Sequence, residues 1–127
     1  MRLLLDTHML LWFMNNDPRL GAHAEIIANP ANHIFVSTVS LMEIAVKIRA
    51  GKLRVELPDL LSEIERQGFD LLPLNPHHVL ELAKLPIFPD HKDPFDHQLI
   101  GQAIAEDMPF LSQDPHAGRY PVKVPSP

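Results

Sequence analysis

The sequence predicts a single α/β domain with a central, mostly parallel β-sheet flanked by helices. Short apolar runs alternate with segments of helical periodicity along the chain, and strands that alternate with helices usually pair in parallel. With 127 residues, of which 46% are hydrophobic, the chain can bury a real core but is too short to divide comfortably in two. We therefore expect one domain spanning residues 1–127.

The first half of the chain is predicted to form two strands and three helices. Asn15 and Asn16 end the first helix, and Asp17 can cap a second helix that has Pro18 at its first position. Gly51 ends the third helix. The expected elements are a strand at 2–5, helices at 8–14 and 18–28, a strand at 34–36 and a helix at 39–50.

The second half continues the alternation. Pro58 and Pro76 are placed to begin helices, and Gly68 separates the first of these from the strand that follows. The expected elements are a helix at 58–66, a strand at 69–72, helices at 76–84 and 94–106, a strand at 109–111 and a candidate last strand at 122–124. Most of the thirteen prolines lie at these boundaries, so they indicate ends of elements and not a disordered tract.

Composition excludes several classes of protein. The chain has no cysteine, which rules out a disulfide framework and a thiolate zinc site. The apolar run at the start is too short for a signal peptide, and no later run approaches the ~18 residues of a membrane span. We therefore expect a soluble, cytoplasmic protein without a membrane partner. The net charge of −5 argues against binding nucleic acid mainly through a broad basic surface.

Four acidic residues carry the strongest functional signal. Asp6, Glu43, Asp96 and Asp114 each fall just past an apolar strand-like run or in the helix that follows one. In an open α/β sheet the loops at the carboxyl ends of the strands meet in one crevice, so these distant acids could form one cluster. Crowded carboxylates repel one another unless a cation lies among them. Hard oxygen ligands favour Mg²⁺, with Mn²⁺ as a substitute, and indicate phosphate chemistry by metal-activated water with one ion or two.

Each acid also has a simpler structural interpretation. Glu43 lies on the narrow polar strip of an otherwise apolar helix and could pair with Lys47 one turn later. Asp93 precedes Pro94, as a helix cap does, and could also support the ion from behind its ligands. Asp96 would then lie in the first helical turn, where the helix dipole favours its negative charge and is expected to lower its pKa.

The remaining two acids could be turn residues, and hydroxyl groups stand beside both. Asp6 could cap the helix that follows it, and Asp114 precedes a proline, as in many turns. Thr7 and Ser112 lie within two residues of these acids. Their hydroxyls could hold a carboxylate or a water on the ion, or could be ordinary helix caps.

Basic residues and histidines leave further alternatives open. The densest basic stretch could contact RNA or a partner's acidic residues, or could be a solvated helix end; it consists of Lys47, Arg49, Lys52 and Arg54. The eight histidines raise the alternative of a histidine-rich metal site, but no pair has the i, i+4 spacing of a helical zinc motif. We expect most of them to be exposed, with His8 and His97 close enough to the acids to touch a substrate phosphate.

Four segments together resemble the PIN domain family, most closely the VapC-type toxins of type II toxin-antitoxin systems. The segments are LLLDTHMLLW, VSTVSLMEIAVKIRAGKL, DPFDHQLIGQAIAED and FLSQD. The resemblance covers nearly the whole chain, with the segments in order, and each segment contains one of the four acids. Gly101 stands where many relatives have alanine, a small-for-small change that we expect to leave the site intact.

The resemblance implies a specific function. It implies a metal-dependent endoribonuclease in which Asp6, Glu43, Asp96 and Asp114 hold Mg²⁺ or Mn²⁺, and the partners would be RNA, a cognate antitoxin whose segment occupies the groove, and a second copy in a homodimer. The apolar surfaces of the first and third helices also suggest an interface. Two alternatives stay open: a DNA or structure-specific PIN nuclease with the same acids, and a non-catalytic module that binds nucleic acid.

Overall fold

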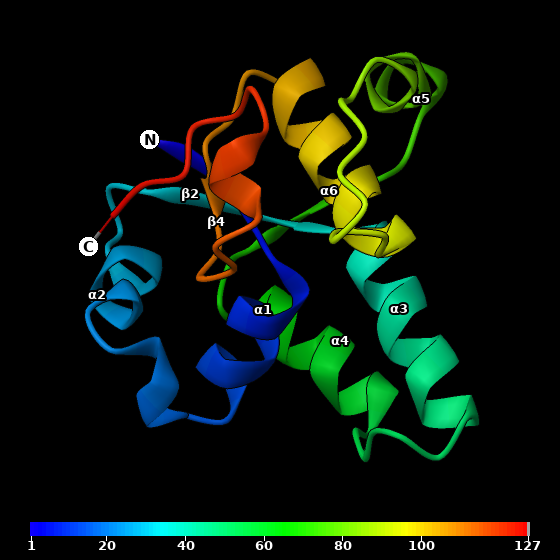
Figure 1. The fold of residues 1–127 in the computed structure, drawn as a ribbon. Helices are drawn as coiled ribbons and strands as arrows, with labels where there is room; N and C mark the ends of the chain where they lie inside the picture. Colours follow the sequence, from blue (N-terminus) through cyan, green and yellow to red (C-terminus); the bar gives the residue numbers. More distant parts are fainter. Residues whose placement is uncertain (127) are drawn as a thin grey trace.

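The computed structural model describes residues 1–126 and contains a four-stranded parallel sheet with helices on both faces (Figure 1). The spatial order is β3-β2-β1-β4. The strands are β1 (Arg2–Leu5), β2 (His33–Ser37), β3 (Asp70–Leu72) and β4 (Phe110–Leu111). The helices are α1 (Thr7–Met14), α2 (His23–Ala28), α3 (Thr38–Arg49), α4 (Leu57–Arg66), α5 (Pro76–Ala83) and α6 (Pro94–Ala105), with short 3₁₀ helices η1 (Pro18–Leu20) and η2 (Ala117–Arg119). The predicted α/β class is confirmed.

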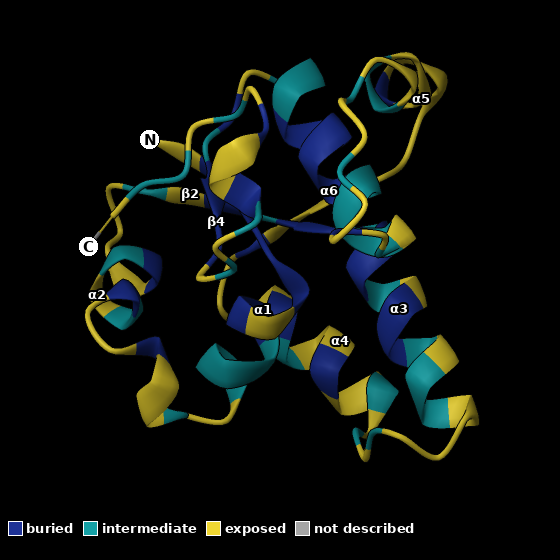
Figure 2. Cartoon of the chain, viewed as in Figure 1, coloured by how far each residue is buried: buried dark blue, intermediate teal, exposed yellow. Residues whose placement is uncertain are grey.

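The alternating side chains of β1 divide the core into two layers. Leu3 and Leu5 pack on one face of the sheet with residues of α1, α2 and α4, while Leu4 packs on the other face with α6 and η2. All three leucines are almost completely inaccessible to solvent. Figure 2 shows the same pattern, with buried residues along the strands and on the helix faces turned toward them. Both faces of the sheet are covered, which explains why β1 is a continuous apolar run.

Parallel pairing brings the carboxyl ends of three strands to one edge of the sheet. β1 pairs with β2 on one side and with β4 on the other. The backbone N–H of Asp6 donates to the carbonyl of Leu111 at 3.0 Å, so pairing continues one residue past β1. On the other side, α3 begins directly after the last residue of β2. This edge therefore holds the starts of α1 and α3 and the loop after β4.

Two sequence predictions about secondary structure are wrong. The helix expected over 18–28 is divided into η1 and α2, because Gly21 between them has a φ of 54° that a helix cannot continue through. The strand expected at 122–124 does not form, although the N–H of Phe110 donates to the carbonyl of Lys123 at 2.8 Å. Pro121 and Pro125 flank this segment and lack the N–H groups that a longer ladder would need.

Within the described residues 1–126, no helix is both long enough and apolar enough to cross a membrane.

A buried polar network joins β2, α5 and α6. Ser37 donates its hydroxyl hydrogen to Gln102, whose side-chain amide lies 3.3 Å from Nδ1 of His78. The backbone N–H of Asn75 also donates to this Nδ1, so the ring accepts there and its Nε2–H can donate to Glu106 at 3.0 Å. Every member has a partner, as buried polar groups require. The network fixes how the two helices meet over the sheet.

α5 and α6 approach most closely at Gly101. A Cβ atom built on this residue would lie 3.2 Å from the backbone nitrogen of Leu82 on α5. This distance is tighter than most Cβ contacts, and backbone atoms cannot swing aside as side chains can. Glycine therefore lets the two helices pack closely, while alanine would require a small shift of α5.

We expect Gly101→Val to lower the free energy of unfolding by about 1–3 kcal/mol, because the branched side chain forces α5 away from α6. Gly118→Val is the matched control, since nothing lies within 4 Å of its added Cβ. The control should change stability by less than about 0.5 kcal/mol. Urea unfolding measures both, and equal effects of the two substitutions would contradict the close packing at Gly101.

Candidate metal centre

Asp6 lies at the carboxyl end of β1 and is held by two hydrogen bonds. Its Oδ1 accepts the backbone N–H of His8 at 2.9 Å, so the residue caps α1. Its Oδ2 accepts the hydroxyl hydrogen of Ser112, in the loop after β4, at 2.6 Å. The side chain is buried, with 4% of the residue exposed. Asp6 therefore caps the helix with one oxygen, as one interpretation of the sequence expected, and its other oxygen is held by the hydroxyl of Ser112, as the sequence also suggested.

Glu43 is the most deeply buried acid of the group, at 1% exposed. Its Oε2 accepts a hydrogen from Lys47 Nζ at 2.7 Å, which is the ion pair expected one helical turn apart. Its Oε1 is also buried, and no residue of the described chain gives it a hydrogen bond. Leaving a buried carboxylate oxygen without a partner is costly. The ion pair with Lys47 therefore compensates the burial of only one of the two carboxylate oxygens.

Asp93 and Asp96 begin α6 and have different roles. Oδ1 of Asp93 accepts the N–H groups of Phe95 at 2.9 Å and Asp96 at 3.4 Å, so it is the predicted helix cap. Asp96 Oδ2 lies 3.2 Å from Nε2 of His91. Burial, together with the charges of Asp6 and Asp93 and a smaller effect of Glu43, raises the pKa of Asp96 to about 6, against the lowering effect of its hydrogen bond with His91. The lowered pKa expected from the helix dipole is wrong, because burial and acidic neighbours outweigh the dipole.

The electrostatic couplings indicate that three acids lie near one another. The charges of Asp6 and Glu43 both act on Asp96. Lys47 has a raised pKa chiefly because of its hydrogen bond to Glu43, with further contributions from the charges of Asp93 and Asp96. His8 has a raised pKa chiefly because of Asp6. The carboxylates of Asp6 just after β1, Glu43 on α3 and Asp96 on α6 thus lie near one another, with one lysine and one histidine beside them.

Asp114 lies at the margin of this group, across His91 from Asp96. Its Oδ2 is 4.0 Å from Nε2 of His91, the same nitrogen that contacts Asp96. Burial would raise the pKa of Asp114, but hydrogen bonds from the backbone and ring of His116 outweigh it and lower the pKa. Asp114 and Asp6 also line one cavity of about 310 Å³. Asp114 is thus near the other acids but is paired with histidines.

The chemistry of these residues fits a divalent cation. The buried carboxylates of Asp6 and Glu43 and the half-buried one of Asp96 repel one another, and a cation among them removes the repulsion. The unpartnered Oε1 of Glu43 is an oxygen that could serve as a ligand of a metal ion. Oxygen donors of this type suit Mg²⁺ or Mn²⁺ better than softer ions. In the apo protein, Lys47 offsets part of the negative charge.

The other residues named from the sequence are placed as follows. The hydroxyl of Thr7 donates to Ser40 Oγ at 2.8 Å in a buried contact, so it joins α1 to α3 and does not bind a carboxylate. Lys47 and Lys52 line a cavity of about 430 Å³ that also includes Trp12. The other two members of the basic stretch, Arg49 and Arg54, are exposed on the surface.

The histidines differ from expectation, and they include the site residues that sequence reasoning missed. Only His8, His33 and His77 are exposed, so the prediction that most would be exposed is wrong. The missed residues are His91 and His116, both in contact with Asp114. The available signals were weak: His116 is two residues past Asp114, and His91 is five residues before Asp96. Nothing in the sequence alone brings the two histidines together.

The ring of His97 contacts the loop before α6. Its Nε2 lies 2.9 Å from the backbone carbonyl of His91, to which the ring N–H can donate. This contact holds the loop before α6. His8 remains beside Asp6, with its Nδ1 3.8 Å from the carboxylate.

Known structures with similar folds were found by comparison. The fold is similar to a chain in the crystal structure of VapBC2 from Rickettsia felis bound to a DNA fragment from their promoter, with 17% sequence identity and a TM-score of 0.70. That match covers 98% of this chain and 96% of the other. DNA-bound VapBC from Salmonella typhimurium gives 15% identity and a TM-score of 0.68, covering 98% and 97% of the two chains.

Sequence comparison identifies the family. No curated protein sequence matched the chain. At identities this low, the similarity to the two crystal structures establishes the fold alone. The family model of the PIN domain, however, matches residues 3–123, which is nearly the whole chain. The resemblance to this family is thereby confirmed, and the chain belongs to the PIN domain family.

Proposed function

We propose that this protein is a metal-dependent endoribonuclease and the toxin component of a type II toxin-antitoxin system. The observation that carries the proposal is that buried Asp6 and Glu43 and half-buried Asp96 lie near one another at the carboxyl edge of the sheet, with one oxygen of Glu43 unpartnered. Membership of the PIN domain family supports the same activity. The similarity in fold to chains of VapBC complexes supports a cognate antitoxin as the partner. The protein would act in the cytoplasm, where its RNA substrate is found.

The proposed ligands of Mg²⁺ or Mn²⁺ are Asp6, Glu43 and Asp96, with Asp114 binding directly or through water. When bound, the ion supplies positive charge that activates water and stabilises the charge developing on the phosphate. The protein's own contribution is to fix the ligands. Ser112 and the start of α1 hold the carboxylate of Asp6, and Lys47 holds one oxygen of Glu43.

The cavity beside the ligands is suited to nucleic acid. Lys47 and Lys52 line it with the ring of Trp12, and Arg19 lies over that ring at 4.8 Å. Lysines can pair with phosphates, and an aromatic ring can stack with a base. These groups supply local positive charge to a chain whose net charge is −5. Arg49 and Arg54, on the surface next to the cavity residues, would extend the contact with RNA or with the antitoxin.

Homodimer formation also belongs to the proposal. Met42 and Val46 on α3 are 52% and 48% exposed, although both side chains are large and apolar. They are one helical turn apart and therefore lie on one face of α3. This exposed apolar face agrees with the interface expected on the third helix.

Cleavage of defined RNA tests the activity. Purified antitoxin-free protein should cleave RNA in the presence of Mg²⁺ or Mn²⁺, and EDTA should abolish the cleavage. DNA of the same sequence should stay intact. Glu43→Gln should reduce cleavage by more than about 100-fold, because it removes the buried charge that the ion requires. Glu65→Gln is the matched control. Glu65 is exposed on α4, so this variant should cleave RNA like wild type.

Equal cleavage by Glu43→Gln and wild type would identify a contaminating nuclease or a wrong site. Faster cleavage of the DNA would point to a different PIN nuclease.

The raised pKa of Asp96 predicts a pH-dependent effect on stability. Since the folded protein holds this proton more tightly than an unfolded chain, the stabilisation is full at low pH and is lost as pH rises through about 6. Without metal, Asp96→Asn should be more stable than wild type at about pH 7.5, by about 1–2 kcal/mol after allowing for solvent screening, and equal to it at about pH 4.

Urea unfolding in EDTA at the two pH values measures the difference. Adding Mg²⁺ at the higher pH should stabilise wild type more than the variant. A variant that is less stable than wild type at the higher pH without metal would show that the carboxylates do not repel one another.

A further inference from the structure

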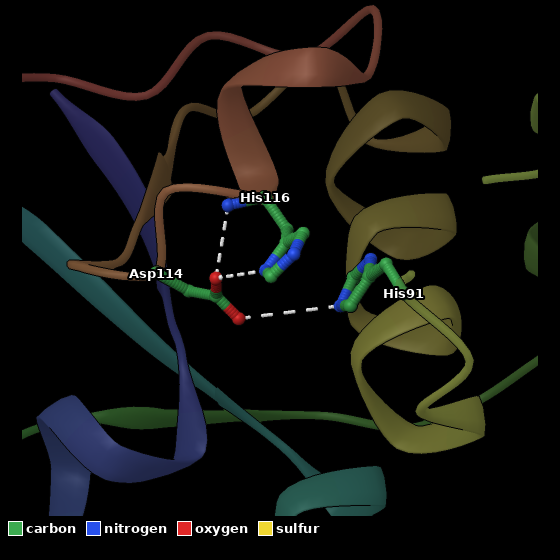
Figure 3. A group of neighbouring side chains, drawn as sticks. All are labelled: His91, Asp114 and His116. Carbon is green, nitrogen blue, oxygen red and sulfur yellow. Dashed lines mark hydrogen bonds and ion pairs between the residues drawn. The ribbon is translucent and has the colours of Figure 1, made fainter. Parts of the chain in front are cut away.

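A second group of possible metal ligands lies beside the carboxylates. His91, Asp114 and His116 each offer one ligand atom, and these atoms all lie within 4.8 Å of one another. Figure 3 shows the three side chains pointing toward a common centre, with His91 from the loop before α6 and the other two from the loop after β4. Nδ1 of His116 is 2.9 Å from Oδ1 of Asp114, and Nε2 of His91 is 4.0 Å from Oδ2.

The far nitrogen of each imidazole has an oxygen partner. Nδ1 of His91 lies 2.8 Å from the hydroxyl of Tyr120. Nε2 of His116 lies 3.7 Å from a carboxylate oxygen of Asp90, and Asp90 is itself held by Arg119 at 2.8 Å. Histidines that bind metals typically use one ring nitrogen as the ligand and donate the other to an oxygen, which fixes the ring. The ring of His91 shows this arrangement, and the far nitrogen of His116 has Asp90 within ion-pair distance.

Ordinary packing explains this group only in part. His91 is buried at 7% exposed, and its ring is stacked on that of His116, with centroids 4.8 Å apart and planes inclined by 9°. Nδ1 of His116 faces the carboxylate of Asp114, and Nε2 of His91 lies between two carboxylates, 3.2 Å from Asp96 and 4.0 Å from Asp114.

We propose that Nε2 of His91, Nδ1 of His116 and the carboxylate of Asp114 bind a borderline transition-metal ion such as Zn²⁺ or Co²⁺. Two imidazoles and one carboxylate are the donors that such ions use, whereas Mg²⁺ prefers oxygen ligands only. Three protein ligands leave one position open to water or another ligand. The site adjoins the carboxylate group, with which it would share Asp114. Its existence does not depend on the proposed nuclease activity.

Zn²⁺ binding to the full-length protein tests the site in the presence of saturating Mg²⁺. Calorimetry measures affinity, and NMR of the histidine rings reports which imidazoles bind. We expect one Zn²⁺ per chain, with ring signals of His91 and His116 shifting while that of His77 does not. His116→Ala should weaken binding by about 10-fold or more. The matched control, His77→Ala, removes an exposed histidine and should bind like wild type.

Glu43→Gln separates this site from the carboxylate group. It alters the deepest carboxylate but none of the three proposed ligands, so Zn²⁺ should still bind and shift the two ring signals. Circular dichroism checks the fold, and His116→Asn, which retains more of the ring's volume, replaces His116→Ala if that variant unfolds. Unchanged affinity in the His116 variant would overturn the proposal. So would loss of Zn²⁺ binding in Glu43→Gln alone, since the ion would then occupy the carboxylate group.

Discussion

The pairing of β1 with both β2 and β4 is the constraint on which the rest of the structure depends. Because the three strands are parallel, their carboxyl ends meet at one edge, and every element that follows them begins there. The bond from Asp6 N–H to Leu111 extends this pairing to the first acid itself. The leucines of β1, buried on both faces, hold the register, since a slip of one residue would exchange the faces.

Charge repulsion is the cost of gathering acids at this edge, and the structure offsets it in several local ways. Asp6 accepts two hydrogen bonds, one oxygen of Glu43 is paired with Lys47, and Asp93 caps a helix. Burial and the remaining repulsion from Asp6, Asp93 and Glu43 nevertheless raise the pKa of Asp96 to about 6. A divalent cation would remove the repulsion, so the features that destabilise the apo protein are those that favour ion binding.

Much of the fold and of the carboxylate group was predictable because both follow local sequence signals. The alternation of strands and helices, the cap at Asp93 and the Glu43–Lys47 pair were all read correctly from neighbouring residues. The failures involve tertiary context. Burial reversed the expected pKa shift of Asp96, and the contact of His91 with His116 joins loops that are 25 residues apart in the chain, so no local spacing could indicate it.

Calorimetric titration of the metal-free protein with Mg²⁺ tests whether the carboxylates of Asp6, Glu43 and Asp96 form one divalent-cation site, as proposed. Wild type should bind Mg²⁺, and Asp6→Asn should weaken binding by about 10-fold or more, because each carboxylate contributes charge to the same ion. Asp59→Asn, at an exposed acid on α4, should bind like wild type. Equal Mg²⁺ affinity in wild type and Asp6→Asn, or no binding by wild type, would contradict the account.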